Sequence, residues 1–468
     1  MAAPRPRRVI WITSDHMRYD HVGVYGDTGM VTPALDRLAQ HGVNFHRVYT
    51  QNALCMPSRC SFMTGCYPQQ TGVTLNGHGL SPDFEPTVAL AFAGAGYATA
   101  QIGKLHFQPH DQMDYEARPR HAYGFDVFWP SEERGNYSDA YYHWLEGKHP
   151  ELAARFRVPR SSDPDRHFAE KQPQPVDAPW QASQAGWIVE TAKQFLQTRR
   201  DQDWFIHLGF YNPHPPLTPV RKAWDAYADR ELPEPAFQLA GEADANPALA
   251  GTLRQRADWT EEAFRQYRQG LAAMVTEMDW AIGALLDDLE TRGEWDDTLI
   301  VFSSDHGDMA GDHNLTHKAN HFYEACMRVP LILHWPAGLG TARRDCHGLM
   351  EMVDLLPTLI ELCGGRPHPS MAGQSVAEDL RAGREPVGRP DVYAYSGEPR
   401  AMLRTTTHKY CWFGPDAEVL YDLESDPGET RDAARDSDQS ATLVTLRARC
   451  LERSLEASRS PQRRLYPY

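Results

Sequence analysis

The feature that most constrains the fold is a repeated alternation between short apolar runs and amphipathic helical segments. Runs typical of strands buried on both faces occur at 9–13, 97–102, 204–210, 299–302 and 329–335. Helical patterns lie between them, and the longest, at about 261–292, carries an apolar stripe and ends at Gly293. This alternation predicts an α/β fold with a large, mostly parallel sheet sandwiched by helices.

The pattern changes near residue 390. Short apolar runs separated by turn residues predict a smaller C-terminal antiparallel sheet, with a helix at about 441–455 packed on it. We therefore expect a large α/β domain over residues 1–385 and an α+β subdomain over 386–468. The segment at about 107–185 is rich in Pro, Asp, His and aromatic residues, so we expect an irregular insertion over one end of the sheet.

The chain has 468 residues and a formal net charge of −16. This acidity disfavours nucleic acid and anionic membrane as partners, and no apolar run approaches the roughly 18 residues of a membrane span. The apolar run at 9–12 is too short for a signal-peptide core, so we expect a cytoplasmic protein. The eight cysteines lack metal-type spacing, and reduced thiols are a simpler interpretation than a disulfide framework.

The segment at 52–65 contains Cys55, Pro57 and Arg59 in close succession. Pro57 suits the first turn of a helix, which would place Cys55 just before a helix N-terminus. The helix dipole and free N–H groups there favour an anionic nucleophile and an anionic substrate, and Arg59 follows one turn later. A buried thiol beside a turn is the structural alternative, but the whole stretch favours a functional cysteine.

Polar residues follow several of the predicted strands. Asp15 and Asp305 each come directly before a histidine at a strand end, and Lys104 follows another strand. In an open α/β sheet the carboxyl edge is where ligands bind, so these groups are expected to converge. A single Asp is more often a turn former or helix cap. Two Asp-His pairs together favour a divalent cation site, because carboxylates are hard oxygen ligands.

These motifs resemble those of the type I, formylglycine-dependent sulfatases of the alkaline phosphatase-like superfamily. Residues 55–59 resemble the segment whose cysteine is oxidised to formylglycine, and 15–23 and 304–313 resemble the two metal motifs. Further segments resembling family landmarks are 103–106, 212–215, the region of Lys318, 353–358 and 420–427. The resemblance covers roughly residues 8–430.

The resemblance implies a mechanism. A formylglycine-generating enzyme would convert Cys55, one hydroxyl of the hydrated aldehyde would attack sulfur, and sulfate would leave as the aldehyde re-forms. One divalent ion would be held by Asp15, Asp305, His306 and residue 55, and would polarise the sulfate. The remaining implied roles are sulfate neutralisation by Lys104 and Lys318, proton transfer by His106 and His214, and positioning of the diol by Arg59.

Two departures from the family pattern concern the metal. His16 stands where many sulfatases carry a second Asp, and His306 stands where many carry Asn. Fewer carboxylates and more imidazole favour Mn²⁺ over Ca²⁺. We include His16 among the candidate metal ligands, and the alternative is that its ring points elsewhere.

Other functions of the same superfamily remain open at this stage. A phosphonate monoester or phosphodiester hydrolase, a sulfamate hydrolase and a non-catalytic carbohydrate-binding protein are the alternatives. Cys55 with Lys104, His106 and Lys318 favours a sulfuric ester hydrolase. The predicted substrate is a small-molecule or sugar sulfate ester, since the aromatic residues of the insertion suit a sugar ring or an aryl group equally. The oligomeric state is unknown from sequence.

Overall fold

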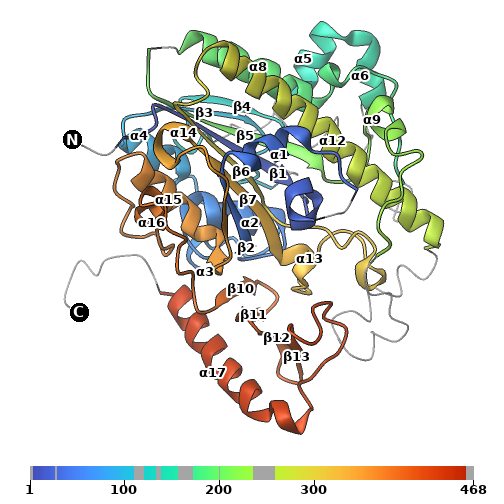
Figure 1. The fold of residues 1–468 in the computed structure, drawn as a ribbon, viewed down its shortest axis with the longest axis vertical. Coiled ribbons are helices and arrows are strands. Elements are labelled where there is room, and N and C mark those ends of the chain that lie inside the picture. The colour runs from blue at the N-terminus through green and yellow to red at the C-terminus, as the bar shows by residue number, and fades with distance from the viewer. Residues whose placement is uncertain are drawn as a thin grey trace.

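The computed structural model describes residues 4–26, 29–109, 121–132, 139–156, 172–199, 201–235 and 259–459. Within these residues the main sheet has nine strands in the order β4-β3-β5-β1-β6-β7-β2-β8, with β9 beside β2 (Figure 1). Their bounds are β1 (Arg8–Asp15), β2 (Val43–Tyr49), β3 (Ala98–Gly103), β4 (Val127–Pro130), β5 (Trp204–Pro213), β6 (Thr298–Ser304), β7 (Arg328–His334), β8 (Arg344–Cys346) and β9 (Met350–Glu351).

The centre of the sheet is parallel, as the sequence predicts. β1 lies between β5 and β6, and β3 and β4 continue the parallel order beyond β5. β7 runs antiparallel to both β6 and β2, so the sheet is mixed on that side. The parallel strands end at one edge, and their last residues carry the polar groups that the sequence singled out.

Helices cover both faces of the main sheet. α1 (Pro33–Gln40), α8 (Gln184–Thr198) and α12 (Glu261–Thr291) pack on one face, in a core that receives Ile10 and Ile12 of β1. The opposite face receives Val9 and Trp11, because successive side chains of a strand point to opposite faces. Its helices are α2 (Cys55–Thr64), α4 (Val88–Gly94), α15 (Leu355–Leu362) and α16 (Ala377–Arg381).

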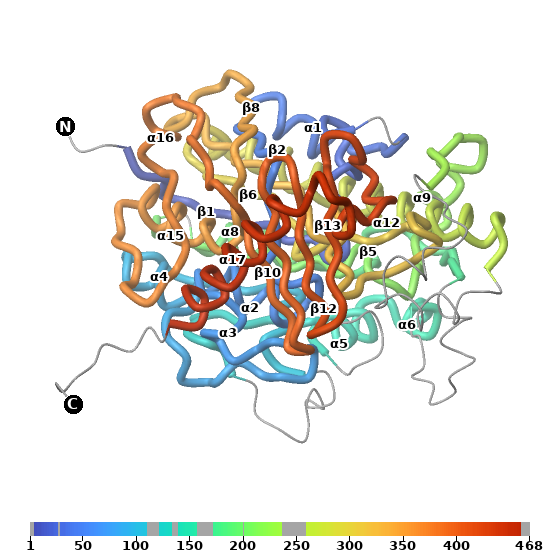
Figure 2. The backbone as a smooth tube through the Cα atoms, turned by 90° about the horizontal axis from the view of Figure 1, so that it is seen from below, coloured from blue at the N-terminus to red at the C-terminus, as the bar shows by residue number. Residues whose placement is uncertain are grey.

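The C-terminal part forms an antiparallel sheet in the order β10-β11-β12-β13, also as predicted. One face packs on the main domain, and α17 (Ser440–Ala457) covers part of the other (Figures 1 and 2). Buried Lys409 pairs with Glu324 at 2.7 Å and Glu429 at 2.6 Å, which ties this sheet to the main domain. The strand bounds are β10 (Val392–Ser396), β11 (Arg400–Arg404), β12 (His408–Gly414) and β13 (Ala417–Asp422).

The segment 107–185 differs from the expected irregular insertion. β4 pairs in parallel with β3 and extends the main sheet, and two helices follow, α5 (Ala140–Lys148) and α6 (Pro150–Phe156). Four residues are too short a run to show a strand period, and Pro130 is tolerated because β4 lies at the sheet edge. Residues 110–120, 133–138 and 157–171 of this segment lie outside the described residues.

Shorter elements complete the described chain. The short helices are α3 (Pro68–Thr71), α9 (Arg221–Asp225), α13 (Glu324–Met327) and α14 (Pro336–Leu339). Turns of 3-10 helix occur at Tyr19–His21, Gly23–Tyr25, Trp180–Ala182, Asp312–Asn314, Met352–Asp354 and Ser437–Gln439. Among the helices of the described ranges, none combines the length and the apolar character that crossing a bilayer requires.

Candidate active site

The candidate active site lies at the carboxyl edge of the parallel strands. β1 ends at Asp15, β6 ends one residue before Asp305, and β3 ends one residue before Lys104. These strands and β5 are neighbours, so their carboxyl ends meet at one place. The N-terminus of α2 approaches the same place and delivers Cys55.

Cys55 is the point on which these groups converge. α2 begins at Cys55, one residue earlier than predicted, and its side chain is buried. Its Sγ lies 3.3 Å from Nε2 of His306 and 3.7 Å from Oδ1 of Asp15, and it accepts a hydrogen bond from the Lys318 ammonium. The side chain of residue 55 is therefore the shared neighbour of Asp15, His306 and Lys318.

The encoded thiol is poorly suited to be a nucleophile itself. Burial raises the pKa of the Cys55 thiol to about 11, and the Asp15 carboxylate adds to this effect despite the nearby lysines. The thiolate is the reactive form of cysteine, so at neutral pH this side chain would be almost wholly protonated. The site therefore does not activate the encoded thiol as a nucleophile.

Four residues fit a divalent cation. One ligand atom from each of Asp15, Cys55, Asp305 and His306 lies within 4.8 Å of the others. Nδ1 of His306 bonds to the carbonyl of Gly307 at 2.9 Å, which leaves Nε2 facing the cluster, as outer hydrogen bonds do at metal sites. Burial, helped by Lys318, lowers the pKa of His306 to about 4, so the imidazole is neutral, as metal ligation requires.

Arg59 holds the two carboxylates of this cluster. Its Nε donates to Oδ2 of Asp305 at 2.7 Å, and a terminal nitrogen lies 3.5 Å from Oδ2 of Asp15. Burial acts to raise the pKa of Asp15, but Lys104 and other nearby cations hold it well below its usual value. Both carboxylates are thus fixed in position, and Asp15 is kept ionised.

Lys318 joins residue 55 to two histidines. Its Nζ lies 3.1 Å from Nε2 of His214 and 3.5 Å from Nδ1 of His16, in addition to its bond to Cys55. Burial, together with the charge of Lys318, lowers the pKa of both histidines well below its usual value. Each neutral ring therefore presents a lone pair to the ammonium group.

His16 has a further partner that the sequence interpretation did not assign. Its Nε2 lies 3.1 Å from Oδ2 of Asp308, and the hydroxyl of Tyr267 donates to the same oxygen at 2.8 Å. His16 also belongs to two other groups of potential metal ligands, one with Asp15 and His214, the other with Asp308 and His317. Asp308 lies three residues after Asp305 within the predicted metal motif, and this position is the signal by which the sequence could have revealed it.

Two further predicted residues, His106 and His214, lie in the loops that follow β3 and β5. His106 has a φ of 59°, its side chain is buried, and its N–H donates to Oε1 of Glu132 at 3.0 Å. His214 follows the end of β5, and its Nδ1 lies 2.5 Å from the carbonyl of Pro215. The roles of His106 and His214 stay predictions.

The position of Lys104 depends on two glycines. Its Nζ lies 2.6 Å from Oδ2 of Asp15. A β-carbon at Gly209 would lie 1.9 Å from the carbonyl oxygen of Lys104, and one at Gly103 would lie 2.1 Å from that of Gly209. Gly103 also has a φ of 90°, so only glycine fits where β3 and β5 deliver this lysine.

The fold and this cluster define a hydrolase of the alkaline phosphatase-like class. The profile of the sulfatase family matches residues 7–365, and a second profile, N-sulphoglucosamine sulphohydrolase, C-terminal, matches residues 311–456. The chain therefore belongs to the sulfatase family, and it is a sulfatase-type enzyme.

Named relatives agree with this assignment. The chain is 30% identical to an arylsulfatase of Clostridium perfringens, over 90% of this chain and 89% of the relative. It is 32% identical to a choline-sulfatase of Rhizobium meliloti, over 89% of this chain and 80% of the relative. A solved phosphonate monoester hydrolase of Agrobacterium radiobacter has a TM-score of 0.82 at 25% identity and covers 97% of this chain and 96% of its own.

Proposed function

We propose that this enzyme hydrolyses a sulfate monoester to an alcohol and sulfate, using a formylglycine derived from Cys55. The observation that carries the proposal is the convergence on Cys55 Sγ of a neutral imidazole, His306, and a cation, Lys318. An anionic ester bound there would meet fixed positive charge in a buried site, where such charge stabilises a transition state strongly. The matched family and the two sulfatase relatives support the same reaction.

Two groups complete the proposed site. Asp15, Asp305, His306 and residue 55 would hold one divalent ion, Mn²⁺ or Ca²⁺, which when bound supplies Lewis-acid stabilisation of a sulfate oxygen. Formylglycine, after addition of water to its aldehyde, would supply the attacking hydroxyl and a second hydroxyl through which sulfate is released. A formylglycine-generating enzyme is therefore a required partner.

The side chains of this protein have separate tasks in the proposal. Lys104 and Lys318 neutralise the oxygens of the bound sulfate, and Arg59 keeps both carboxylates in place. His214, which keeps Nε2 beside Lys318, takes part in protonating the leaving alcohol. His106 accepts a proton from residue 55 when sulfate is released. The contact between His16 and Lys318 supports a positioning role for His16, in competition with its predicted role as a fifth metal ligand.

The proposal is tested by trapping the covalent sulfate ester on residue 55. Cys55→Ser keeps a hydroxyl but lacks the second hydroxyl, so it should transfer sulfate once and stall as a covalent ester. Mass spectrometry after incubation with an aryl sulfate should find one added sulfate on the peptide that contains residue 55. A variant that binds substrate and metal but never carries sulfate would contradict the two-step reaction.

A phosphonate monoester hydrolase is the second candidate function. The observation in its favour is the similarity over nearly the whole chain to the phosphonate monoester hydrolase of Agrobacterium radiobacter. A sulfamate hydrolase is a third, supported by the C-terminal profile match. Comparing kcat/KM on an aryl sulfate, a sugar sulfate, choline sulfate, a phosphonate monoester and a sulfamate separates them, and we expect a sulfate ester to rank first.

The remaining assignments stay predictions. We expect a small-molecule or sugar sulfate ester as substrate, a cytoplasmic location, and domain limits at 1–385 and 386–468. Cell fractionation followed by immunodetection tests the location, and limited proteolysis near residue 385 tests the domain limit.

A further inference from the structure

Helix α17 carries two apolar stripes, and only one of them is covered. The covered stripe packs on the C-terminal sheet, and Arg453 within it bonds to Oε1 of Glu351 and to the hydroxyl of Tyr67, both at 2.7 Å. These contacts fix the helix rigidly on the protein. The covered stripe consists of Leu443, Leu446, Cys450, Arg453 and Ala457.

The second stripe faces solvent. Among the described residues, six large hydrophobic side chains are exposed, and three of them lie on α17: Val444 (61%), Leu451 (63%) and Leu455 (64%). Exposed Ala441, Ala448 and Ser458 complete the stripe. Its members, at 441, 444, 448, 451, 455 and 458, alternate in spacings of three and four, which is the spacing of a helix–helix seam.

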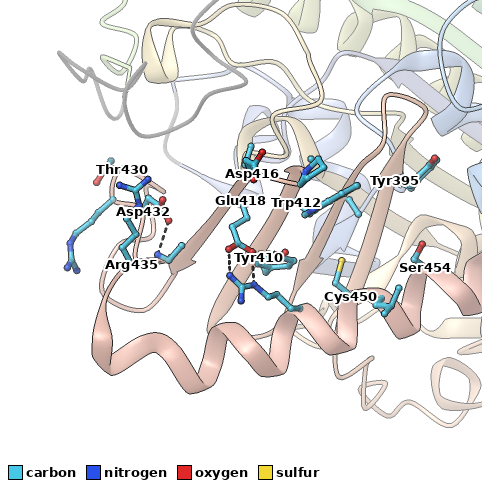
Figure 3. A pocket seen from close by; sticks show the side chains of 18 residues that line it. Tyr395, Tyr410, Trp412, Asp416, Glu418, Thr430, Asp432, Arg435, Cys450 and Ser454 are labelled. Carbon is cyan, nitrogen blue, oxygen red and sulfur yellow. Dashed lines mark hydrogen bonds and ion pairs between the residues drawn. The ribbon is translucent and has the colours of Figure 1, made fainter.

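This exposed seam is accessible to a large partner. α17 lies at the lower edge of the molecule in Figure 1, and in Figure 2, which is seen from below, it lies on the side that faces the viewer. Its inner edge and the sheet enclose a groove of about 1080 Å³, where Cys450 and Ser454 are turned toward the sheet (Figure 3). Leu451 belongs to both the groove and the seam, so the apolar surface of α17 continues into the groove.

The residue sizes along the seam are self-complementary. If two copies of α17 pair antiparallel about a twofold axis between Arg449 and Cys450, position i faces position 899 − i of the other copy. Ala448 then faces the partner's Leu451, Val444 faces the partner's Leu455, and Ala441 faces the partner's Ser458. Each leucine thus meets a smaller side chain and the small Ala441 and Ser458 meet at the ends, which allows close packing of the two helices.

We propose that the exposed seam of α17 is the interface of a twofold symmetric dimer in which the two α17 helices pack antiparallel. The charges that flank the seam are compatible with this pairing, because position 447 faces position 452 and Arg447 is therefore level with the partner's Glu452. Arg447 pairs with Glu418, and Glu452 lies 3.2 Å from Arg449. The twofold axis therefore brings charges of opposite sign level with each other on both sides of the seam.

The expected association is weak and reversible. α17 has 18 residues and is about 27 Å long, so one helix pair buries less than the roughly 800 Å² per partner of a standard stable interface. The dimer should therefore form at high protein concentration and dissociate on dilution.

Sedimentation velocity over a wide range of protein concentration tests the interface. The unaltered protein should show a reversible monomer–dimer equilibrium. Leu451→Glu, which places two carboxylates in the seam, should remain monomeric. Val387→Glu is the matched control, because Val387 is 95% exposed and lies outside α17, and it should dimerise like the unaltered protein. Activity on a sulfate ester should be the same in all three and reports correct folding. A protein that is monomeric throughout, or a Leu451→Glu variant that dimerises, would overturn the proposal.

Disulfide cross-linking tests the register. Ala441→Cys and Ser458→Cys are made as separate variants, and the native cysteines are all buried and free. In the antiparallel pairing, residue 441 meets residue 458 of the partner subunit, whereas two copies of residue 441 lie about 25 Å apart along the axis. A mixture of the two variants should therefore form a linked dimer under mild oxidation, and neither variant should do so alone. Cross-linking of each variant alone, or none in the mixture, would overturn this arrangement.

Discussion

His16 Nε2 lies 3.1 Å from Oδ2 of Asp308, while Nδ1 of the same ring lies 3.5 Å from Nζ of Lys318. Asp308 therefore fixes the tautomer of His16, with the proton on Nε2, and leaves the lone pair of Nδ1 facing the ammonium. Lys318 in turn donates to residue 55. This chain of contacts supports the proposed positioning role of His16, which requires no bond to the metal.

Replacing His16 separates this positioning role from the predicted metal-ligand role. We expect His16→Ala to retain bound metal and to lower kcat/KM about 10- to 100-fold, the effect typical of losing an outer hydrogen-bonding partner. His16→Gln, whose amide can both donate to Asp308 and accept from Lys318, should recover part of the loss. Elemental analysis gives the bound metal and steady-state kinetics give the rate. Loss of the metal from His16→Ala would establish His16 as a ligand.

Asp308→Asn tests the first of the contacts that run from Asp308 through His16 and Lys318 to residue 55. An amide at 308 can present its nitrogen rather than an acceptor oxygen to His16, so the ring loses its fixed orientation and Lys318 loses an acceptor. We expect a lower kcat with KM and bound metal little changed, because Asp308 is separated from residue 55 by His16 and Lys318. A variant with unaltered kcat would show that this carboxylate does not act through Lys318.

Metal removal should abolish activity reversibly. The cluster offers two carboxylates and the neutral imidazole of His306. This mixed set of oxygen and nitrogen donors suits Mn²⁺ better than Ca²⁺, because Ca²⁺ prefers oxygen ligands alone. After exhaustive chelation we expect Mn²⁺ to restore more activity than Ca²⁺ at equal free concentration. Full recovery with Ca²⁺ and none with Mn²⁺ would contradict this assignment of the donor set.

Gly209→Ala should disturb Lys104 through the backbone. The added methyl group would lie 1.9 Å from the Lys104 carbonyl oxygen, so β3 and β5 must separate. We expect the free energy of unfolding to fall by about 1–3 kcal/mol, with a loss of kcat/KM. Gly147→Ala is the control, since a β-carbon there meets no atom within 4 Å and α5 should gain up to about 1 kcal/mol. Equal stability of the two variants in chemical denaturation would refute the close approach.

His334 should make the protein less stable in mild acid. It is buried in β7 against Trp295, with ring centroids 4.2 Å apart, and burial lowers its pKa to about 3. Between that value and the usual value near 6.5, the unfolded chain binds a proton that the folded protein does not, so stability rises with pH. His334→Phe removes this pH-dependent contribution to the free energy of unfolding. From pH 7 to pH 5 the unaltered protein should lose about 2 kcal/mol more than the variant, and parallel pH profiles would contradict this.

Much of the fold follows from the sequence because its strands are buried on both faces. β1, β5 and β6 appear as continuous apolar runs, and their parallel order follows from the helices between them. The antiparallel direction of β7 could not be predicted from the sequence, since strand direction depends on the end of the sheet at which the chain re-enters it. β4 was missed because four residues carry no periodic signal.

The part of the site that lies at strand ends was predictable, because sequence motifs mark those ends. Asp15, Lys104 and Asp305 converge because parallel strands finish at one edge. Sequence could not reveal which neighbour each histidine faces. His16 meets Asp308 only because the loop after β6 folds back toward the end of β1, a contact between residues 292 positions apart.

The state of residue 55 in active enzyme is the most direct test of the proposed chemistry. The protein should be produced together with a formylglycine-generating enzyme and digested, and the peptide containing residue 55 analysed by mass spectrometry. We predict an aldehyde at residue 55, in a fraction of molecules that rises in proportion to specific activity, and no turnover by Cys55→Ala. Fully active protein in which residue 55 is an unmodified thiol would contradict the account.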